Sequence, residues 1–175
     1  MSKLQPETNV PAHRDNDWLA DLLADLWYRH FPDVLQPNDV RIKFGQAAAT
    51  RLGSIKWGRK AINHPDGTTQ RRSIITITSH FRDPSVPETV VRGVIAHELV
   101  HYAHGFSSPN PKLHRHPHHG GIVERELRRR GLGSTLESEQ DWLKDIWPSF
   151  LKRHHQPKRR HRYHFLKSKQ FLISG

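Results

Sequence analysis

The 175-residue chain contains no cysteine, which excludes a disulfide framework, a cysteine-based zinc ribbon and a thiol nucleophile. It also lacks any run of about 18 apolar residues, the length that a membrane-spanning helix needs. The first residues have no apolar stretch of the kind found in a signal peptide. We therefore expect a single-domain, soluble, cytoplasmic protein with no membrane partner.

Acidic residues are missing from the C-terminal end. Residues 149–175 hold eight basic and no acidic side chains, so they carry +8 of the net charge of +11, whereas residues 1–40 carry −4. A basic segment of this kind commonly binds nucleic acid, such as DNA, or another polyanion, and it fits a solubilising tail equally well. The cationic residues that would contact phosphates are Lys152, Arg153, Lys158, Arg159, Arg160 and Arg162.

The polarity of the chain divides it into three segments. Residues 1–15 are polar and lack periodicity, which predicts a flexible arm. Residues 16–148 carry the periodic apolar patterns of a folded domain, and residues 149–175 form a basic, histidine-rich tail.

Apolar spacing within the domain predicts an α+β fold. We expect helices over about 16–31, 87–105, 121–130 and 134–148, and strands over 40–44, 53–57 and 73–78. A turn at residues 64–67 favours a small antiparallel sheet. Asp15 or Asn16 can cap the first helix, and Ser134 with Glu137 resembles a capping box for the last.

The run His97-Glu98-Leu99-Val100-His101 carries the clearest chemistry. Positions i and i+4 of a helix share one face, so both imidazoles can reach one zinc ion at roughly 2.0–2.1 Å. Glu98 lies off that face, close enough to take a proton from a water at the metal. The alternative is a pair of surface histidines near a helix C-terminus.

A catalytic zinc usually needs a third protein ligand and an open fourth position. His119 directly precedes Gly120-Gly121 and a helix, which would hold it rigidly, and it ranks first. Glu124, inside that helix, ranks second. Glu126 and His104, which lies on the same helical stripe as His101, are less favoured. The remaining candidates lie in a proline-broken loop where a ligand would be badly positioned, and they are His114, His116 and His118. Tyr102 and His104 are weak candidates for stabilising an oxyanion.

These residues resemble the SprT-like family, relatives of the DNA-dependent protease Spartan. The similarity covers about residues 18–132 and includes Arg51-Leu52-Gly53, the run 95–101 and His119-Gly-Gly-Ile-Val123. It implies a minimal zincin fold, zinc ligands His97, His101 and His119, Glu98 as catalytic base, and a peptide bound along a sheet edge. Val123 stands where the family usually has an aromatic residue, and the basic tail replaces the family's zinc ribbon.

The sequence therefore predicts a zinc-dependent metalloendopeptidase that acts on protein substrates, with DNA-associated proteins as one class. A regulatory peptidase that cleaves one specific partner is the first alternative. A non-catalytic nucleic-acid-binding module with a structural zinc, closed by a fourth ligand, is the second.

Overall fold

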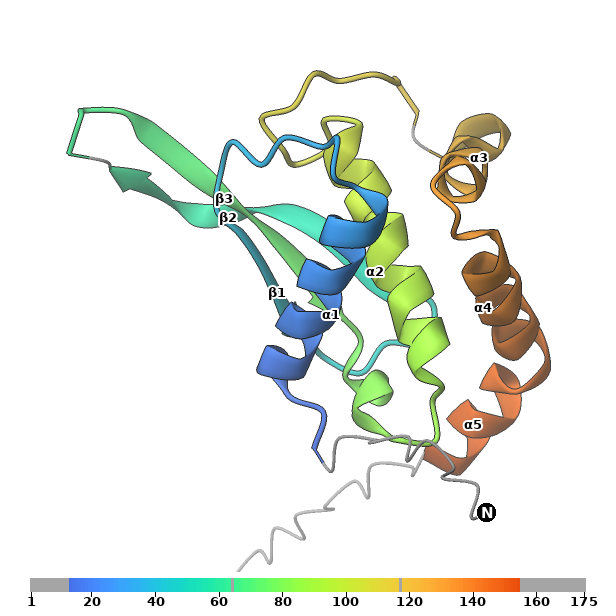
Figure 1. The fold of residues 1–175 in the computed structure, drawn as a ribbon. Helices are drawn as coiled ribbons and strands as arrows, with labels where there is room; N and C mark the ends of the chain where they lie inside the picture. Colours follow the sequence, from blue (N-terminus) through green and yellow to red (C-terminus); the bar gives the residue numbers. More distant parts are fainter. Residues whose placement is uncertain (1–12, 64, 117, 155–175) are drawn as a thin grey trace, which may run out of the picture.

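A computed structural model describes residues 13–63, 65–116 and 118–154 of the chain. These residues form an α+β domain with five α-helices and a three-stranded sheet, which confirms the predicted class (Figure 1). In chain order the elements are α1 (Asn16–His30), β1 (Val40–Phe44), β2 (Gly53–Asn63), β3 (Thr69–Ile77), the 3-10 helix η1 (Ser79–Arg82), α2 (Glu88–Ala103), the 3-10 helix η2 (His119–Gly121), α3 (Ile122–Arg129), α4 (Gly133–Asp145) and α5 (Trp147–His154).

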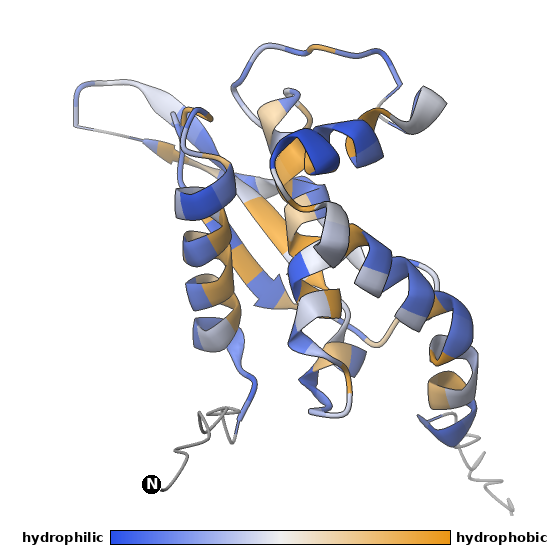
Figure 2. Ribbon diagram, turned by 45° about the vertical axis from the view of Figure 1, so that its right-hand side comes forward, coloured by the Kyte–Doolittle hydropathy of each residue, from blue (hydrophilic) through white to orange (hydrophobic). Residues whose placement is uncertain are grey.

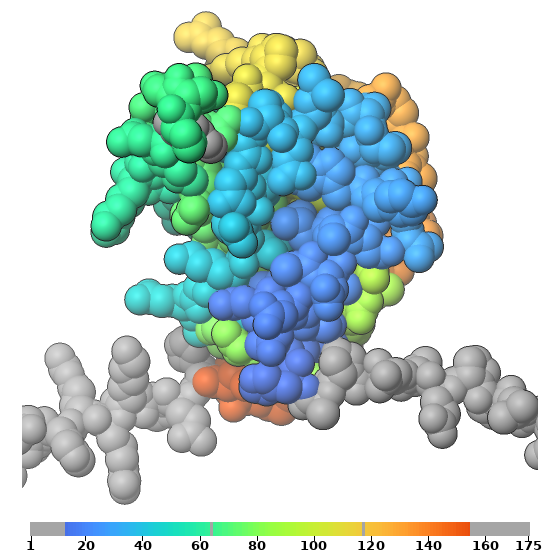
Figure 3. Space-filling view, turned by 60° about the vertical axis from the view of Figure 1, so that its left-hand side comes forward, coloured from blue at the N-terminus to red at the C-terminus, as the bar shows by residue number. Residues whose placement is uncertain are grey.

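The sheet is mixed, with strand order β1-β3-β2. β2 and β3 form the predicted antiparallel hairpin, whose far end projects beyond the helices and stands at the edge of the molecule (Figures 1 and 3). β1 instead pairs in parallel with β3, with Val40 opposite Ser73 and Phe44 opposite Ile77. The expected all-antiparallel sheet is therefore wrong. β3 carries three isoleucines and takes the central position, where both of its edges are covered.

The first helix packs on the sheet as its pattern predicts. The Asp15 side chain accepts a hydrogen bond from the backbone N–H of Trp18 at 2.9 Å and caps the helix. Its apolar stripe faces the sheet (Figure 2), and the buried members are Leu19, Leu22, Leu23 and Leu26. Arg92 of α2 binds Asp25 of α1 at 2.7 Å, which fixes the two helices against each other.

α2 is the central helix of the domain. It lies against β2 and α1 on one side and against α3 and α4 on the other (Figure 1). Most of its residues are buried, including Val90, Val94, Ile95 and Leu99. A helix covered in this way can hold polar side chains in a site that water reaches only through a cleft.

The folded part of the chain extends beyond the predicted boundaries at 15 and 148. Arg14, assigned to the arm, is buried, and its guanidinium donates hydrogen bonds to the backbone carbonyls of Phe81, Asp83 and Val86. At the other end the folded domain does not end at Pro148, because a proline fits the first turn of a new helix. α5 begins at Trp147 and buries Phe150.

The predicted capping box of α4 is wrong. The helix begins at Gly133, one residue before Ser134, and no side chain caps it. Glu137 instead forms an ion pair with Arg128 of α3, with a nitrogen–oxygen distance of 2.7 Å. None of the helices in the described ranges has the length and apolar character needed to cross a membrane. Residues 1–12 of the arm and residues 155–175 of the basic tail lie outside the described residues.

Phe150→Ala should lower the free energy of unfolding by about 3–5 kcal/mol, because it removes a fully buried ring that stacks on Trp147 at 5.1 Å. Urea denaturation followed by tryptophan fluorescence measures this change. Lys152→Ala, at an exposed position of the same helix, should change stability by less than about 0.5 kcal/mol. Equal, small effects of the two substitutions would contradict the packing of α5 described above.

Candidate metal centre and cleft

Three imidazoles meet on one side of α2. His97 and His101 lie one helical turn apart, with ring centroids separated by 4.8 Å. His118 arrives from the segment that precedes α3, and its ring centroid lies 5.4 Å from that of His97 and 4.6 Å from that of His101. One nitrogen of each ring lies within 4.8 Å of the others. The three residues can therefore serve as ligands of one metal ion.

The third histidine of this group is His118 and not the predicted His119. His119 is exposed and lies outside the metal-compatible group found among the described residues. Gly120 and Gly121 both have positive φ, 65° and 66°, so the backbone turns sharply between His119 and α3. With this turn the side chain of His118, one residue earlier, stacks on His97.

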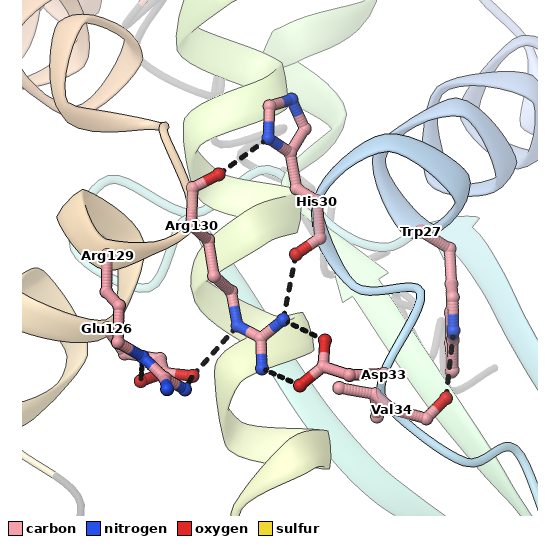
Figure 4. A network of polar contacts seen from close by, with 7 residues as sticks. All are labelled: Trp27, His30, Asp33, Val34, Glu126, Arg129 and Arg130. Carbon is pink, nitrogen blue, oxygen red and sulfur yellow. Dashed lines mark hydrogen bonds and ion pairs between the residues drawn. The ribbon is translucent and has the colours of Figure 1, made fainter.

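α3 is held in place by an arginine network at its C-terminal end (Figure 4). The Arg130 guanidinium binds the Asp33 carboxylate at 2.5 and 3.0 Å, the carbonyl of His30 at 2.8 Å, and Glu126 at 2.8 Å. The His30 ring returns a contact to the Arg130 carbonyl at 2.8 Å. α3 is thus tied to the end of α1, which fixes the helix that follows His118.

The other candidate ligands lie outside the three-histidine group. His104 is buried at the C-terminal end of α2, and its ring lies against His114 at 4.8 Å. His116 is exposed. Glu124 is also exposed, and its charge acts to raise the pKa of His97 against the stronger effect of burial. These positions make His118 the ligand candidate that the geometry favours.

Tyr102 is a core residue and does not face the site. It is fully buried, and its hydroxyl donates to the Asn38 side-chain oxygen at 2.7 Å. Asn38 in turn donates to the Ser73 hydroxyl at 2.9 Å and to the Arg71 carbonyl at 2.8 Å. Because its hydroxyl is committed to this network, Tyr102 is unsuited to stabilising an oxyanion.

Glu98 is a buried carboxylate at the edge of the histidine group, with 6% of its surface exposed. Gly53 at the start of β2 lets it lie there: a Cβ at that position would come within 2.7 Å of the Glu98 Oε1 atom. Burial raises the pKa of Glu98 to about 7, and a hydrogen bond from the Ile55 backbone acts in the opposite direction. The carboxyl group can therefore both accept and release a proton near neutral pH.

The histidines suit a metal ion better than they suit protons. Burial, with the neighbouring imidazoles, lowers the pKa of His97 to about 4 and that of His101 to about 3, so both rings are neutral at neutral pH. The Nδ1 atom of His101 is buried and has no hydrogen-bond partner among the described residues. Neutral imidazoles are the form that binds zinc, so the donor set fits this metal.

The histidine group opens into a cleft with a volume of about 710 Å³. One wall is the segment 50–55, which leads into the edge strand β2, and the other is α2. Phe106 and Ser107 close one part of the cleft, and Glu139 of α4 also lines it. The space is large enough to hold several residues of an extended peptide.

No model of a known protein family matches the chain, and no curated protein or solved structure is significantly similar to it.

Sequence reasoning ranked His118 low and missed the roles of two other residues that shape this site. The prolines around His118 made it a less favoured ligand than His119. In the sequence Gly53 is notable only as part of the run Arg51-Leu52-Gly53. Its role, to leave room for the Glu98 side chain, depends on how β2 packs against α2. Glu139 gives no signal, because its position depends on contacts between helices far apart in the sequence.

His118→Ala should abolish tight zinc binding, whereas His119→Ala should leave it intact. Loss of a direct ligand should weaken zinc affinity by about 100-fold or more, beyond the usual effect of residues that only orient ligands. Elemental analysis and titration with a zinc-binding dye on untagged protein measure this. Zinc loss in the His119 variant with retention in the His118 variant would restore the ligand set expected from the sequence.

Proposed function

We propose that this protein is a zinc-dependent metalloendopeptidase of the SprT-like type, with His97, His101 and His118 as ligands and Glu98 as general base. The observation that carries the proposal is the buried Glu98 carboxylate, placed beside three clustered imidazoles at the wall of an open cleft. A structural metal site has no use for a carboxylate that is neither a ligand nor an ion-pair partner.

Glu98 performs the proton transfers in this proposal. Bound zinc supplies a Lewis acid that makes water acidic near neutral pH and polarises a carbonyl. The Glu98 carboxylate takes a proton from the attacking water and later gives it to the leaving amine of the cleaved peptide bond. Its raised pKa suits both steps, because the group is neither a strong acid nor permanently protonated at neutral pH.

The geometry favours a catalytic over a purely structural zinc. Three histidines leave one position of a tetrahedral site open, and this position is what a catalytic zinc uses. Among the residues that the structure describes, the metal-compatible group contains three members, and it adjoins the cleft. β2 is an edge strand along this cleft, so an extended peptide can lie beside it.

Glu98→Gln should retain zinc and lose peptide cleavage by about 1,000-fold, since it removes the proton acceptor but keeps the size of the side chain. Casein digestion and self-cleavage, each measured beside zinc content, test this expectation. The matched control is Glu137→Gln on α4, an exposed residue that should leave both quantities unchanged. Full activity of the Glu98 variant would contradict the proposed role.

We further propose that the peptidase acts on proteins bound to DNA. The support is the charge of +8 on residues 149–175, together with exposed cations on the outer face of the sheet. Arg41 and Lys43 of β1 and Lys56 of β2 lie on this face, opposite the side that packs on the helices. Contacts of such cations with phosphates would bring the site to DNA-associated substrates.

A truncation after His154 should reduce stimulation of cleavage by DNA while keeping the fold. It removes six basic side chains, including Lys158, Arg159, Arg160 and Arg162, but keeps the buried Phe150. The slope of log DNA affinity against log salt concentration should become shallower by about 0.9 for each phosphate that the shortened chain no longer neutralises. DNA binding and cleavage in a salt series test this. Unchanged stimulation would favour the alternative of a regulatory peptidase, which does not need the tail.

A further inference from the structure

The cleft contains a second carboxylate that the proposed mechanism does not use. Glu139 extends from α4 toward Gly93 of α2, where a Cβ would meet the Glu139 Cδ atom at 2.9 Å and its Cβ atom at 3.1 Å. The absence of a side chain at Gly93 therefore gives Glu139 its place. From there it lines the same cleft as His97 and Glu98.

Glu139 has no ionic or hydrogen-bond partner within the described ranges of the chain. Other glutamates of α3 and α4 are paired: Glu137 binds Arg128, and Glu126 binds Arg129 and Arg130. Burial alone raises the pKa of Glu139 to about 7. A carboxylate of this kind is stabilised when a cation enters the cleft beside it.

The distance from Glu139 to the histidine group matches the spacing between a scissile bond and a nearby side chain of an extended peptide. Gly93, His97 and His101 follow one another at intervals of four residues along α2, so Glu139 lies about one helical turn, or ~6 Å, from the histidine group. An extended peptide advances by about 3.3 Å per residue. A side chain one or two residues from the scissile bond therefore reaches Glu139.

We propose that Glu139 is a specificity-determining residue that receives an ammonium or guanidinium group of the substrate next to the scissile bond. This inference rests on the proposed peptidase function and narrows its substrates to polypeptides with a cation at one defined position. The group is a lysine or arginine side chain, or the free amino terminus of the polypeptide. Both present the same charge to the carboxylate, and the test below separates them.

Binding measured without cleavage gives the first test. The probes are dye-labelled, end-blocked octapeptides of glycine, serine and leucine in which one lysine, or its neutral analogue norleucine, occupies each position in turn. Zinc-loaded Glu98→Gln protein should bind one lysine peptide about 10-fold more tightly than its norleucine partner. Adding Glu139→Gln should remove this difference, and adding Glu137→Gln should leave it in place.

Two further measurements identify the cation and guard against a folding defect. If a lysine-free peptide with a free amino end binds more tightly than its end-blocked form, and this difference depends on Glu139, the amino terminus is the natural cation. If the free amino end gives no such difference, the natural cation is a lysine or arginine side chain. Glu139→Lys should reverse the preference toward a peptide carrying glutamate at the same position, a result that a misfolded protein cannot give.

The outcomes separate this inference from the function on which it rests. If the wild-type protein cleaves peptides but Glu139→Gln leaves the lysine preference unchanged, or if no lysine preference exists, the Glu139 site is overturned and the peptidase stands. Should the wild type cleave none of the probes while lysine binding still depends on Glu139, the peptidase proposal fails and the cation site stands.

Discussion

Burial of α2 is the constraint on which the rest of the structure depends. Sheet and α1 cover one side of this helix, and α3 and α4 cover the other. Polar groups enclosed in this way lose water, which makes the imidazoles of His97 and His101 poor bases and Glu98 a weak acid. The same close packing requires glycine where neighbours approach, at Gly53 beside Glu98 and at Gly93 beside Glu139.

Local patterns in the sequence predict the parts of the fold that local physics determines. The spacing of leucines in α1, the cap at Asp15, and the alternation of β1 and β3 each depend on residues within one element. His97, Glu98 and His101 lie within five consecutive residues of one helix, so their shared site follows from helical geometry alone. The α+β class and the hairpin between β2 and β3 follow in the same way.

Contacts between distant segments decide what the sequence could not predict. β1 pairs in parallel with β3, a contact between segments about 30 residues apart that no spacing in β1 reveals. His118, and not His119, belongs to the three-histidine group, and two left-handed glycines turn the chain between this segment and α3. Glu139 lies 46 positions from Gly93 (139 − 93), and only the packing of α4 on α2 brings them together.

The arginine network at Arg130 has a consequence for how the protein is made. Residue 130 leaves the ribosome 29 residues after His101 (130 − 101), and at about 5–20 residues per second this interval lasts a few seconds. During that time the nascent chain presents two histidines on α2 but has no fixed third one. The three-histidine group is therefore complete only after the end of α1 and the end of α3 have joined.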